Sequence, residues 1–213
     1  MNIVLKNDIC GKILDIGGGG EGVIGRLYKK QIVAIDNRQE ELDEAPDCFD
    51  KQLMDAEELV FPDETFDAIT AFYSFMFMST ETRIKAAEEM VRVLKKGGEI
   101  HIWDSEVPNA EKEPFCVDLK IFLPEETIKT TYGVMGLGLE QSFSKTIDIF
   151  QNLGLTCVSK NKNEKKFLSE IYKIKKPALR AFFLTFSTKI SKYSKIEYIY
   201  SQICVIIKMK KYF

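Results

Sequence analysis

Residue types that build metal and disulfide sites are scarce in this chain of 213 residues. It has one histidine, His101, and one tryptophan. Its five cysteines, at positions 10, 48, 116, 157 and 204, form no C-x-x-C pair. Without paired cysteines or clustered histidines we expect no metal site and no disulfide framework, and a reducing compartment is the default.

Long apolar runs are also missing, and no uninterrupted stretch reaches the length that crosses a membrane. The first nine residues include Lys6, Asn7 and Asp8, so they are too polar and too short for a signal peptide. We therefore predict a cytoplasmic protein. A hydrophobic fraction of 45% and a charged fraction of 29% suit one well-buried α/β core plus an appendage.

Charge is distributed unevenly along the chain. Residues 160–213 hold 14 Lys and Arg against 3 Asp and Glu, whereas residues 1–159 hold 16 against 29. The chain is thus an acidic body with a basic end. Such an end can bind a membrane surface or nucleic acid. Because many aromatic residues lie among its lysines, we favour packing on the acidic body, and the nucleic-acid signal is not strong.

The most informative stretch is ILDIGGGGEG at 13–22, an apolar run that breaks into glycines. It predicts a buried strand, a tight loop and a helix over 23–30. Glycine permits positive φ and lets a ligand approach the backbone closely. Three of the glycines also fit the dinucleotide pattern G-x-G-x-x-G, so an NAD(P)-dependent oxidoreductase is a rival hypothesis. Asp15 argues against it, because a carboxylate at the strand end repels a pyrophosphate and attracts a cation.

Five stretches, in order and at normal spacing, resemble the class I S-adenosylmethionine (SAM)-dependent methyltransferases. They are LDIGGGGEG at 14–22, VAIDNRQ at 33–39, LMDAEEL at 53–59, FDAITAFYS at 66–74 and VRVLKKGGEIHIWD at 91–104. They look closest to the group similar to ubiquinone and menaquinone biosynthesis methyltransferases. The family alternates its glycines as D-x-G-x-G-x-G, whereas this chain has Glu21 at the third of those positions and glycine at 22.

The resemblance implies a doubly wound, mostly parallel seven-stranded α/β sheet of Rossmann-like fold. It also implies methyl transfer from SAM to a small-molecule acceptor, in which the protein mainly positions the reactants and excludes water. A SAM-binding regulatory module without turnover is the alternative from another class. Residues 1–176 form the domain in this interpretation, as a monomer or homodimer, with 177–213 as a basic aromatic extension packed on it.

Acidic residues end three predicted strands, and the resemblance assigns them to the cofactor. Asp36 would accept hydrogen bonds from the ribose hydroxyls. Asp55 would accept from the adenine amino group, while the amide of Ala56 meets a ring nitrogen. The predicted cofactor-binding residues are Asp15, Gly17, Gly18, Gly19, Asp36, Asn37, Asp55, Ala56 and Phe72.

Seven largely apolar residues, FYSFMFM at 72–78, follow the fourth predicted strand. By resemblance this segment faces the methyl group and the acceptor, which makes Phe72 and Tyr73 the acceptor-side candidates. The next three apolar residues, at 75–77, either share that role or fill the core. His101 lies inside a strand predicted over 99–104, so we interpret it as a core residue and not as a general base.

The second half of the chain departs from the minimal family pattern. Residues 105–140 are an insertion, with strands predicted at 115–123 and 127–135 about a turn at 124–126. Glycines at 133, 136 and 138 would let the return arm flex as a lid over the acceptor, and a plain edge hairpin is the competing interpretation. A helix over 144–152 and a strand at 155–159 follow. Either 167–174 or 203–207 would then close the sheet.

Overall fold

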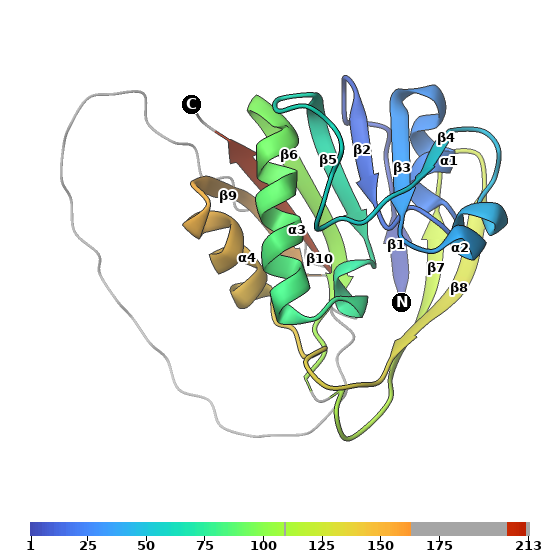
Figure 1. Ribbon diagram of the computed structural model, residues 1–213. Helices are drawn as coiled ribbons and strands as arrows, with labels where there is room; N and C mark the ends of the chain where they lie inside the picture. Colours follow the sequence, from blue (N-terminus) through green and yellow to red (C-terminus); the bar gives the residue numbers. More distant parts are fainter. Residues whose placement is uncertain (109, 163–203, 212–213) are drawn as a thin grey trace, which may run out of the picture.

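A computed structural model describes residues 1–108, 110–162 and 204–211 of the chain (Figure 1). A seven-stranded sheet runs through its centre in the order β4-β3-β2-β5-β6-β10-β9. Neighbouring strands are parallel except at β10, which is antiparallel to both β6 and β9. The strands are β2 Ile13–Ile16, β3 Ile32–Asp36, β4 Asp50–Leu53, β5 Phe66–Phe72, β6 Leu94–Ser105, β9 Leu155–Lys162 and β10 Cys204–Lys211. This confirms the predicted doubly wound, mostly parallel sheet.

The central strands are apolar because both of their faces are covered. All four residues of β2 are buried, and β5 (FDAITAF) exposes no residue. Parallel strands between two layers have this composition, which explains why short apolar runs ending in a polar residue predicted them. Because β2, β3, β4 and β5 run parallel, their carboxyl ends meet at one edge of the sheet. Ligands bind at this edge in open α/β folds.

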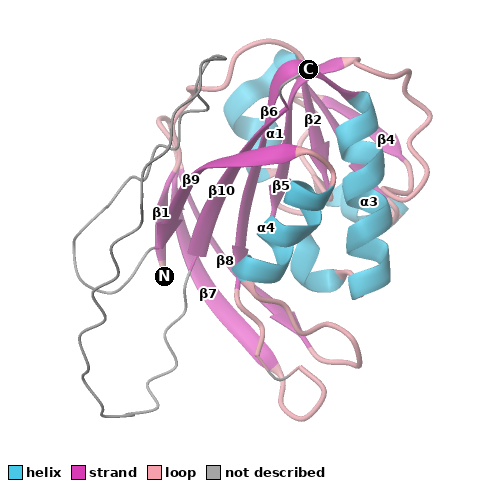
Figure 2. Ribbon diagram, turned by 90° about the vertical axis from the view of Figure 1, so that its left-hand side faces the viewer, coloured by secondary structure: helices cyan, strands magenta, loops and turns pink. Residues whose placement is uncertain are grey.

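Helices cover one face of the sheet, and a helix with a second sheet covers the other (Figure 2). The helices α3 Thr80–Val93 and α4 Phe143–Asn152 pack their buried side chains with β5 and β6. On the opposite face, α1 Val23–Tyr28 shares a core with the second sheet. The shorter elements are α2 Gln39–Glu44 and the 3₁₀ turns η1 Lys29–Gln31 and η2 Phe75–Phe77. Within the described residues, no helix has the length and apolarity needed to cross a membrane.

The sequence predicts a helix over 81–95 that Ser79 or Thr80 caps and that glycines 97 and 98 end. Helix α3 begins as predicted but ends earlier. Ser79 caps it, since the Ser79 hydroxyl accepts a hydrogen bond of 3.1 Å from the Thr82 amide. The helix stops at Val93 and the chain enters β6 directly, so glycines 97 and 98 lie inside the strand rather than ending the helix. Leu94 continues the apolar spacing of the helix but belongs to the sheet, which periodicity alone could not distinguish.

The predicted insertion forms a hairpin in a separate three-stranded sheet. It comprises β7 Phe115–Phe122 and β8 Thr127–Val134, which pair antiparallel about the expected turn. A strand that the sequence did not predict, β1 Asn2–Val4, pairs parallel with β7. Alternate residues of β7, Val117, Leu119 and Ile121, are buried in the core that α1 shares. The hairpin is therefore a layer that packs on α1, and not only a hairpin at the edge of the fold.

The strand that closes the sheet comes from the end of the chain. Strand β10 lies between β6 and β9, with Cys204 opposite Ser105 and Lys210 opposite Glu99. Of the two runs considered from the sequence, 203–207 enters the sheet from Cys204 onward, and 167–174 lies outside the described residues. Residues Cys204–Lys211 thus belong to the sheet although they follow the predicted domain boundary at 176. The predicted packing of 177–203 lies outside the described residues.

Candidate functional site

A tight glycine loop links β2 to α1 at the carboxyl edge of the sheet. Gly17, Gly20 and Gly22 have φ values of +68°, +57° and +55°, which side chains rarely tolerate. Gly22 is also the residue that caps the start of α1. Glu21 is not among the residues with positive φ. The glycine shifted from position 21 to 22 therefore stands where the backbone requires it, which explains this departure from the family pattern.

The loop approaches two carboxylates so closely that only glycine fits. A Cβ added to Gly18 would lie 2.6 Å from Oδ2 of Asp15, and one added to Gly19 would lie 2.9 Å from Oδ2 of Asp36. The Gly18 amide donates to the carbonyl of Ile35, at 2.9 Å, which ties the loop to the next strand. The structure thus brings together the glycines, Asp15 and Asp36, as the sequence predicted for a single site.

Asp15 is buried within β2, with 2% of its surface exposed. Its Oδ1 accepts a hydrogen bond of 2.7 Å from the hydroxyl of Thr70 on β5. Burial raises the pKa of Asp15 to about 7; the Thr70 hydrogen bond opposes this, and the nearby charge of Asp36 adds to it. The ligand-free carboxyl is therefore partly protonated near neutral pH, and a cation bound beside it would favour the charged form.

The remaining cofactor candidates lie along the same edge. Asp36 is the last residue of β3, half-buried, and its Oδ1 accepts from the Arg38 amide at 3.0 Å. Asn37 follows it and is exposed. Asp55 is exposed two residues beyond the end of β4, where its Oδ1 accepts from the amide of Glu57, and Ala56 is buried beside it. These acids end three adjacent parallel strands, so they present negative charge along one rim.

The acceptor-side candidates sit in an aromatic cluster at the end of β5. We define this aromatic cluster by Phe72, Tyr73, Phe77, Trp103 and Tyr132. Phe72 and Tyr73 are buried, and the Tyr73 backbone has a φ of +52°, rare for a residue with a side chain. Tyr73 donates its amide to the carbonyl of Trp103, at 2.7 Å, which fixes this unusual turn. Strain of this kind concentrates at functional sites.

Of the three residues with two open interpretations, two fill the core. Phe75 and Met76 are fully buried, whereas Phe77 is 50% exposed and contacts Tyr132 edge to face. Asp104 holds the segment 75–77 in place, because its Oδ2 accepts a hydrogen bond from the Met76 amide at 3.0 Å. Burial raises the pKa of Asp104 to about 7, as for Asp15.

His101 is a core residue, as expected. It is 7% exposed inside β6, stacks on Trp103 at 5.8 Å between ring centroids, and places Nε2 at 3.3 Å from Oε2 of Glu99. It does not reach the carboxyl edge of the sheet. A role as general base is therefore not supported by its position.

Thr70 and Ser74, on the cofactor side of the site, were missed from the sequence. Thr70 lies mid-strand, and only the pairing of β2 with β5 places it opposite Asp15. Ser74 is buried beside Gly17, and its hydroxyl has no hydrogen-bond partner within the described part of the chain. Buried polar groups almost always have partners, so a hydroxyl at the edge of a glycine loop suits a bound polar ligand. No local sequence signal distinguishes this serine from any other.

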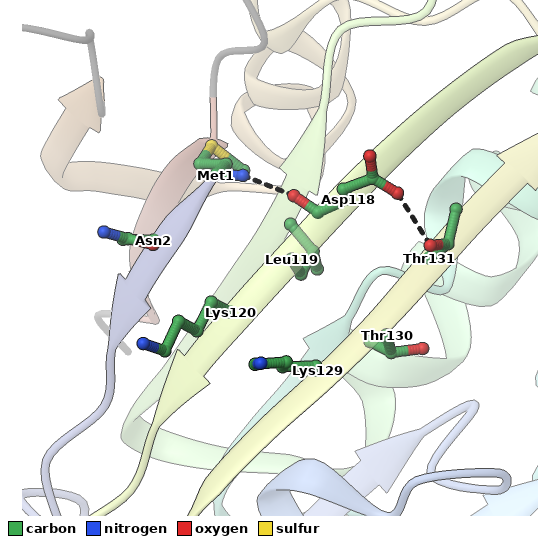
Figure 3. Close-up of a pocket in the computed structure, with 8 residues that line it drawn as sticks. All are labelled: Met1, Asn2, Asp118, Leu119, Lys120, Lys129, Thr130 and Thr131. Atoms are coloured by element: carbon green, nitrogen blue, oxygen red, sulfur yellow. Dashed lines mark hydrogen bonds between the residues drawn. The ribbon is translucent and has the colours of Figure 1, made fainter.

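A separate hollow of about 330 Å³ lies on the outer face of the three-stranded sheet (Figure 3). It is lined by Met1, Asn2, Asp118, Leu119, Lys120, Lys129, Thr130 and Thr131. None of these residues comes from the glycine loop or from the strand ends that carry Asp15, Asp36 and Asp55. The hollow is therefore distinct from the candidate cofactor site.

These residues fit a cofactor that carries positive charge and a ribose but no phosphate. The glycine loop leaves a space that any Cβ would fill, and two carboxylates lie against it. The buried Ser74 hydroxyl beside the loop could donate a hydrogen bond to a ligand bound there. The fold and the residues at this edge are those that the resemblance to class I SAM-dependent methyltransferases predicts, with SAM as the expected cofactor.

Comparison with known proteins agrees. Residues 14–102 match the family model described as a methyltransferase domain. A curated relative, phosphatidylethanolamine N-methyltransferase of Cereibacter sphaeroides, is 36% identical over 103 residues. That match covers 43% of this chain and 49% of the relative, so this chain spans about half the length of that protein.

Solved structures share the fold at low identity. A SAM-dependent methyltransferase from Methanosarcina mazei superposes with a TM-score of 0.58 and 14% identity, covering 97% of this chain and 95% of the other. The [4+2]-cyclase SpnF superposes with a TM-score of 0.52 and 22% identity, covering 73% and 56%. Because one of these proteins is a cyclase by name, the fold alone does not define the reaction.

Proposed function

We propose that this protein transfers a methyl group from SAM to a small-molecule acceptor. The observation that carries the proposal is the contact of the glycine loop with two carboxylates, Asp15 at Gly18 and Asp36 at Gly19. A pyrophosphate on this loop would face Asp15, which disfavours a nicotinamide dinucleotide, whereas Asp36 suits the ribose of either cofactor. SAM has a sulfonium, an ammonium and a ribose, and no phosphate, so it suits such surroundings.

In this proposal each part of the edge has one task. The glycine loop and Asp15 bind the amino-acid end of the cofactor, Asp36 binds the ribose with Asn37 at the mouth, and Asp55 with Ala56 binds the adenine. When bound, SAM supplies an electrophilic methyl carbon. The aromatic cluster excludes water and orients the acceptor toward that carbon, so that catalysis comes mainly from proximity and alignment.

The acceptor is the least determined part of the proposal. The relative named phosphatidylethanolamine N-methyltransferase supports an amine, because its name describes methylation of an amino group. We therefore propose amines as the first class to test. The motifs similar to ubiquinone and menaquinone biosynthesis methyltransferases make quinone precursors the second class.

Two measurements test this function. Calorimetric titration of the purified protein with SAM and with NAD⁺ should give binding of SAM alone; binding of NAD⁺ alone would replace the proposal with an oxidoreductase. A screen with methyl-labelled SAM over ethanolamine-type amines, quinone precursors and mixed metabolite extracts should then label a small molecule. SAM binding without label transfer to any acceptor would favour a regulatory module.

A further inference from the structure

One side chain of the cofactor loop contacts the inserted hairpin. Glu21 is half-buried between Gly20 and the start of α1. Its Oε2 accepts a hydrogen bond of 2.9 Å from the hydroxyl of Tyr132, and its Oε1 accepts from the hydroxyl of Thr130. Both donors are on β8, more than 100 residues away in the chain. A glycine at position 21, as in the family pattern, could not make either contact.

The ring of Tyr132 contacts the acceptor side, whereas its hydroxyl contacts Glu21. Its ring stacks on the ring of Tyr73, with 5.2 Å between centroids and 13° between planes. It also meets Phe77 edge to face, at 6.4 Å. Tyr73 directly follows β5, at the segment proposed to face the acceptor. Tyr132 therefore joins the cofactor loop through its hydroxyl and the aromatic cluster through its ring.

Further contacts hold the hairpin along the same side of α1. Arg26 donates through Nε to the carbonyl of Glu21, at 2.7 Å, and pairs with Glu126 at 3.1 Å. Lys29 pairs with Glu125, at 3.0 Å, at the hairpin turn. Loop, helix and hairpin are thus connected through Arg26. Of these contacts, however, only the Glu21–Tyr132 hydrogen bond joins the cofactor loop to a member of the aromatic cluster.

We propose that Tyr132 is a specificity-determining wall of the acceptor site and that Glu21 is the positioning residue that holds it. Through this contact the order of the cofactor loop is coupled to the order of the acceptor wall. The role of Tyr132 toward the acceptor rests on the proposed function, whereas the coupling between loop and hairpin does not. Coupling is reciprocal, so a ligand that orders the loop also orders β8, and loss of the contact weakens the ligand.

The coupling is tested first without ligand, by amide hydrogen exchange on the full chain. Tyr132→Phe removes only the hydroxyl and keeps the stacked ring. We expect exchange to accelerate roughly ten- to 100-fold both in loop 17–22 and in β8, as for the loss of one hydrogen bond to a charged group. Glu21→Gln, which keeps one acceptor oxygen, should give a smaller effect in the same two segments.

Thr131→Val is the matched control. The Thr131 hydroxyl, on the outer face of β8, donates to Asp118 of the neighbouring strand β7, at 2.7 Å (Figure 3). Its loss should leave exchange in the glycine loop unchanged. The coupling is refuted if Tyr132→Phe accelerates β8 while the loop exchanges as in the wild type. Equal acceleration across all of β6 would equally refute it, because that would be global destabilisation.

The second test adds SAM. In the wild type SAM should slow exchange in β8 as well as in the loop, and Tyr132→Phe should weaken SAM binding about fivefold while Thr131→Val does not. Unchanged exchange in β8 on SAM binding would overturn the coupling to the cofactor. If the wild type binds no SAM, the proposed function fails, and the ligand-free experiment still decides whether loop and hairpin are coupled.

The ring and the hydroxyl of Tyr132 can be separated. Tyr132→Leu removes the stack on Tyr73, and in the labelled-methyl screen it should change the relative labelling of acceptors. Tyr132→Phe keeps the ring, so it should retain the wild-type acceptor profile despite its weaker SAM binding. An unchanged profile in Tyr132→Leu would rule out Tyr132 as a wall of the acceptor site.

Discussion

The two sides of the candidate site are built in different ways. The cofactor side consists of backbone and acids near the ends of consecutive strands: Asp15 lies in β2, Asp36 ends β3 and Asp55 follows β4. The acceptor side combines residues that are distant in sequence, such as Tyr73 and Tyr132. The cofactor side is thus local and nearly dictated by chain order, while the acceptor side depends on where an insertion packs.

Each side also holds one buried carboxyl whose pKa is raised to about 7. Asp15 has a single side-chain partner, the Thr70 hydroxyl. Asp104 accepts two backbone amides and lies near the buried guanidinium of Arg83, yet burial still dominates. The difference in partners indicates that Asp104 is structural, whereas Asp15 lies where a cationic ligand would complete its surroundings.

The largest effect on the cofactor side is expected from Asp36→Ala. Loss of two hydrogen bonds to a charged acceptor should weaken SAM binding about 100-fold or more. Calorimetry measures this, with Asp43→Ala as control, because Asp43 is an exposed acid of the nearby α2 that accepts a hydrogen bond from Gln39. An affinity for SAM within about threefold of the wild type would show that the cofactor edge is misassigned.

The second prediction compares the free energy of unfolding of two variants, Gly18→Ala in the cofactor loop and Gly133→Ala in the hairpin. In Gly18→Ala the new Cβ would lie 2.6 Å from Oδ2 of Asp15 and 2.8 Å from Cβ of Ala34. We expect the free energy of unfolding to fall by roughly 1–3 kcal/mol. In Gly133→Ala the nearest atom is Sγ of Cys116, at 3.0 Å, on an exposed side chain that can rotate. Urea denaturation should show a change within about 0.5 kcal/mol there.

A loss of stability in Gly133→Ala as large as that in Gly18→Ala would contradict this contrast. It would mean that the hairpin arm is as tightly constrained as the cofactor loop. The predicted flexing of the arm as a lid would then be untenable.

Stability should depend on pH through the two buried carboxyls. Between about pH 4 and pH 7 the folded chain keeps protons on Asp15 and Asp104 that the unfolded chain releases. The free energy of unfolding therefore decreases as pH rises through this range. In Asp15→Asn the difference between pH 5 and pH 8 should shrink by about half, measured by urea denaturation. The same pH difference in Asp15→Asn and wild type would refute the burial argument for Asp15.

The smallest effect is expected at the hairpin turn. The pair of Lys29 and Glu125 is exposed, with 55% and 80% of the side chains accessible. Glu125→Gln should change the free energy of unfolding by no more than about 0.5 kcal/mol and leave SAM affinity unchanged. A weaker affinity for SAM in this variant would show that the hairpin turn, and not only the Glu21 contact, communicates with the cofactor loop.

Much of the fold could be predicted from the sequence because its signals are local. The hairpin at β7 and β8 was found from two alternating runs about a short turn. The end of α3 was not, because Leu94 keeps the helical spacing of Ala87 and Val91 and glycines 97 and 98 resemble a helix end, although all three lie in β6. Strand β1 was also missed, because three residues carry too little periodicity and its partner β7 begins more than 100 residues later.

The residues of the candidate site also fall into a group that the sequence predicted and a group that it did not. Glycines and acids at strand ends were predictable, because positive φ values and the direction of parallel strands constrain residue type directly. Thr70, Ser74 and Tyr132 were not, since their positions carry no special backbone requirement. They entered the site only when distant strands were brought together.

Chain order and residue type were enough to define the cofactor edge, because consecutive parallel strands must end at the same side of the sheet. The tertiary structure alone decided that β10 closes the sheet and that Glu21 meets Tyr132. Both depend on contacts across more than 90 residues, for which neither periodicity nor spacing contains information.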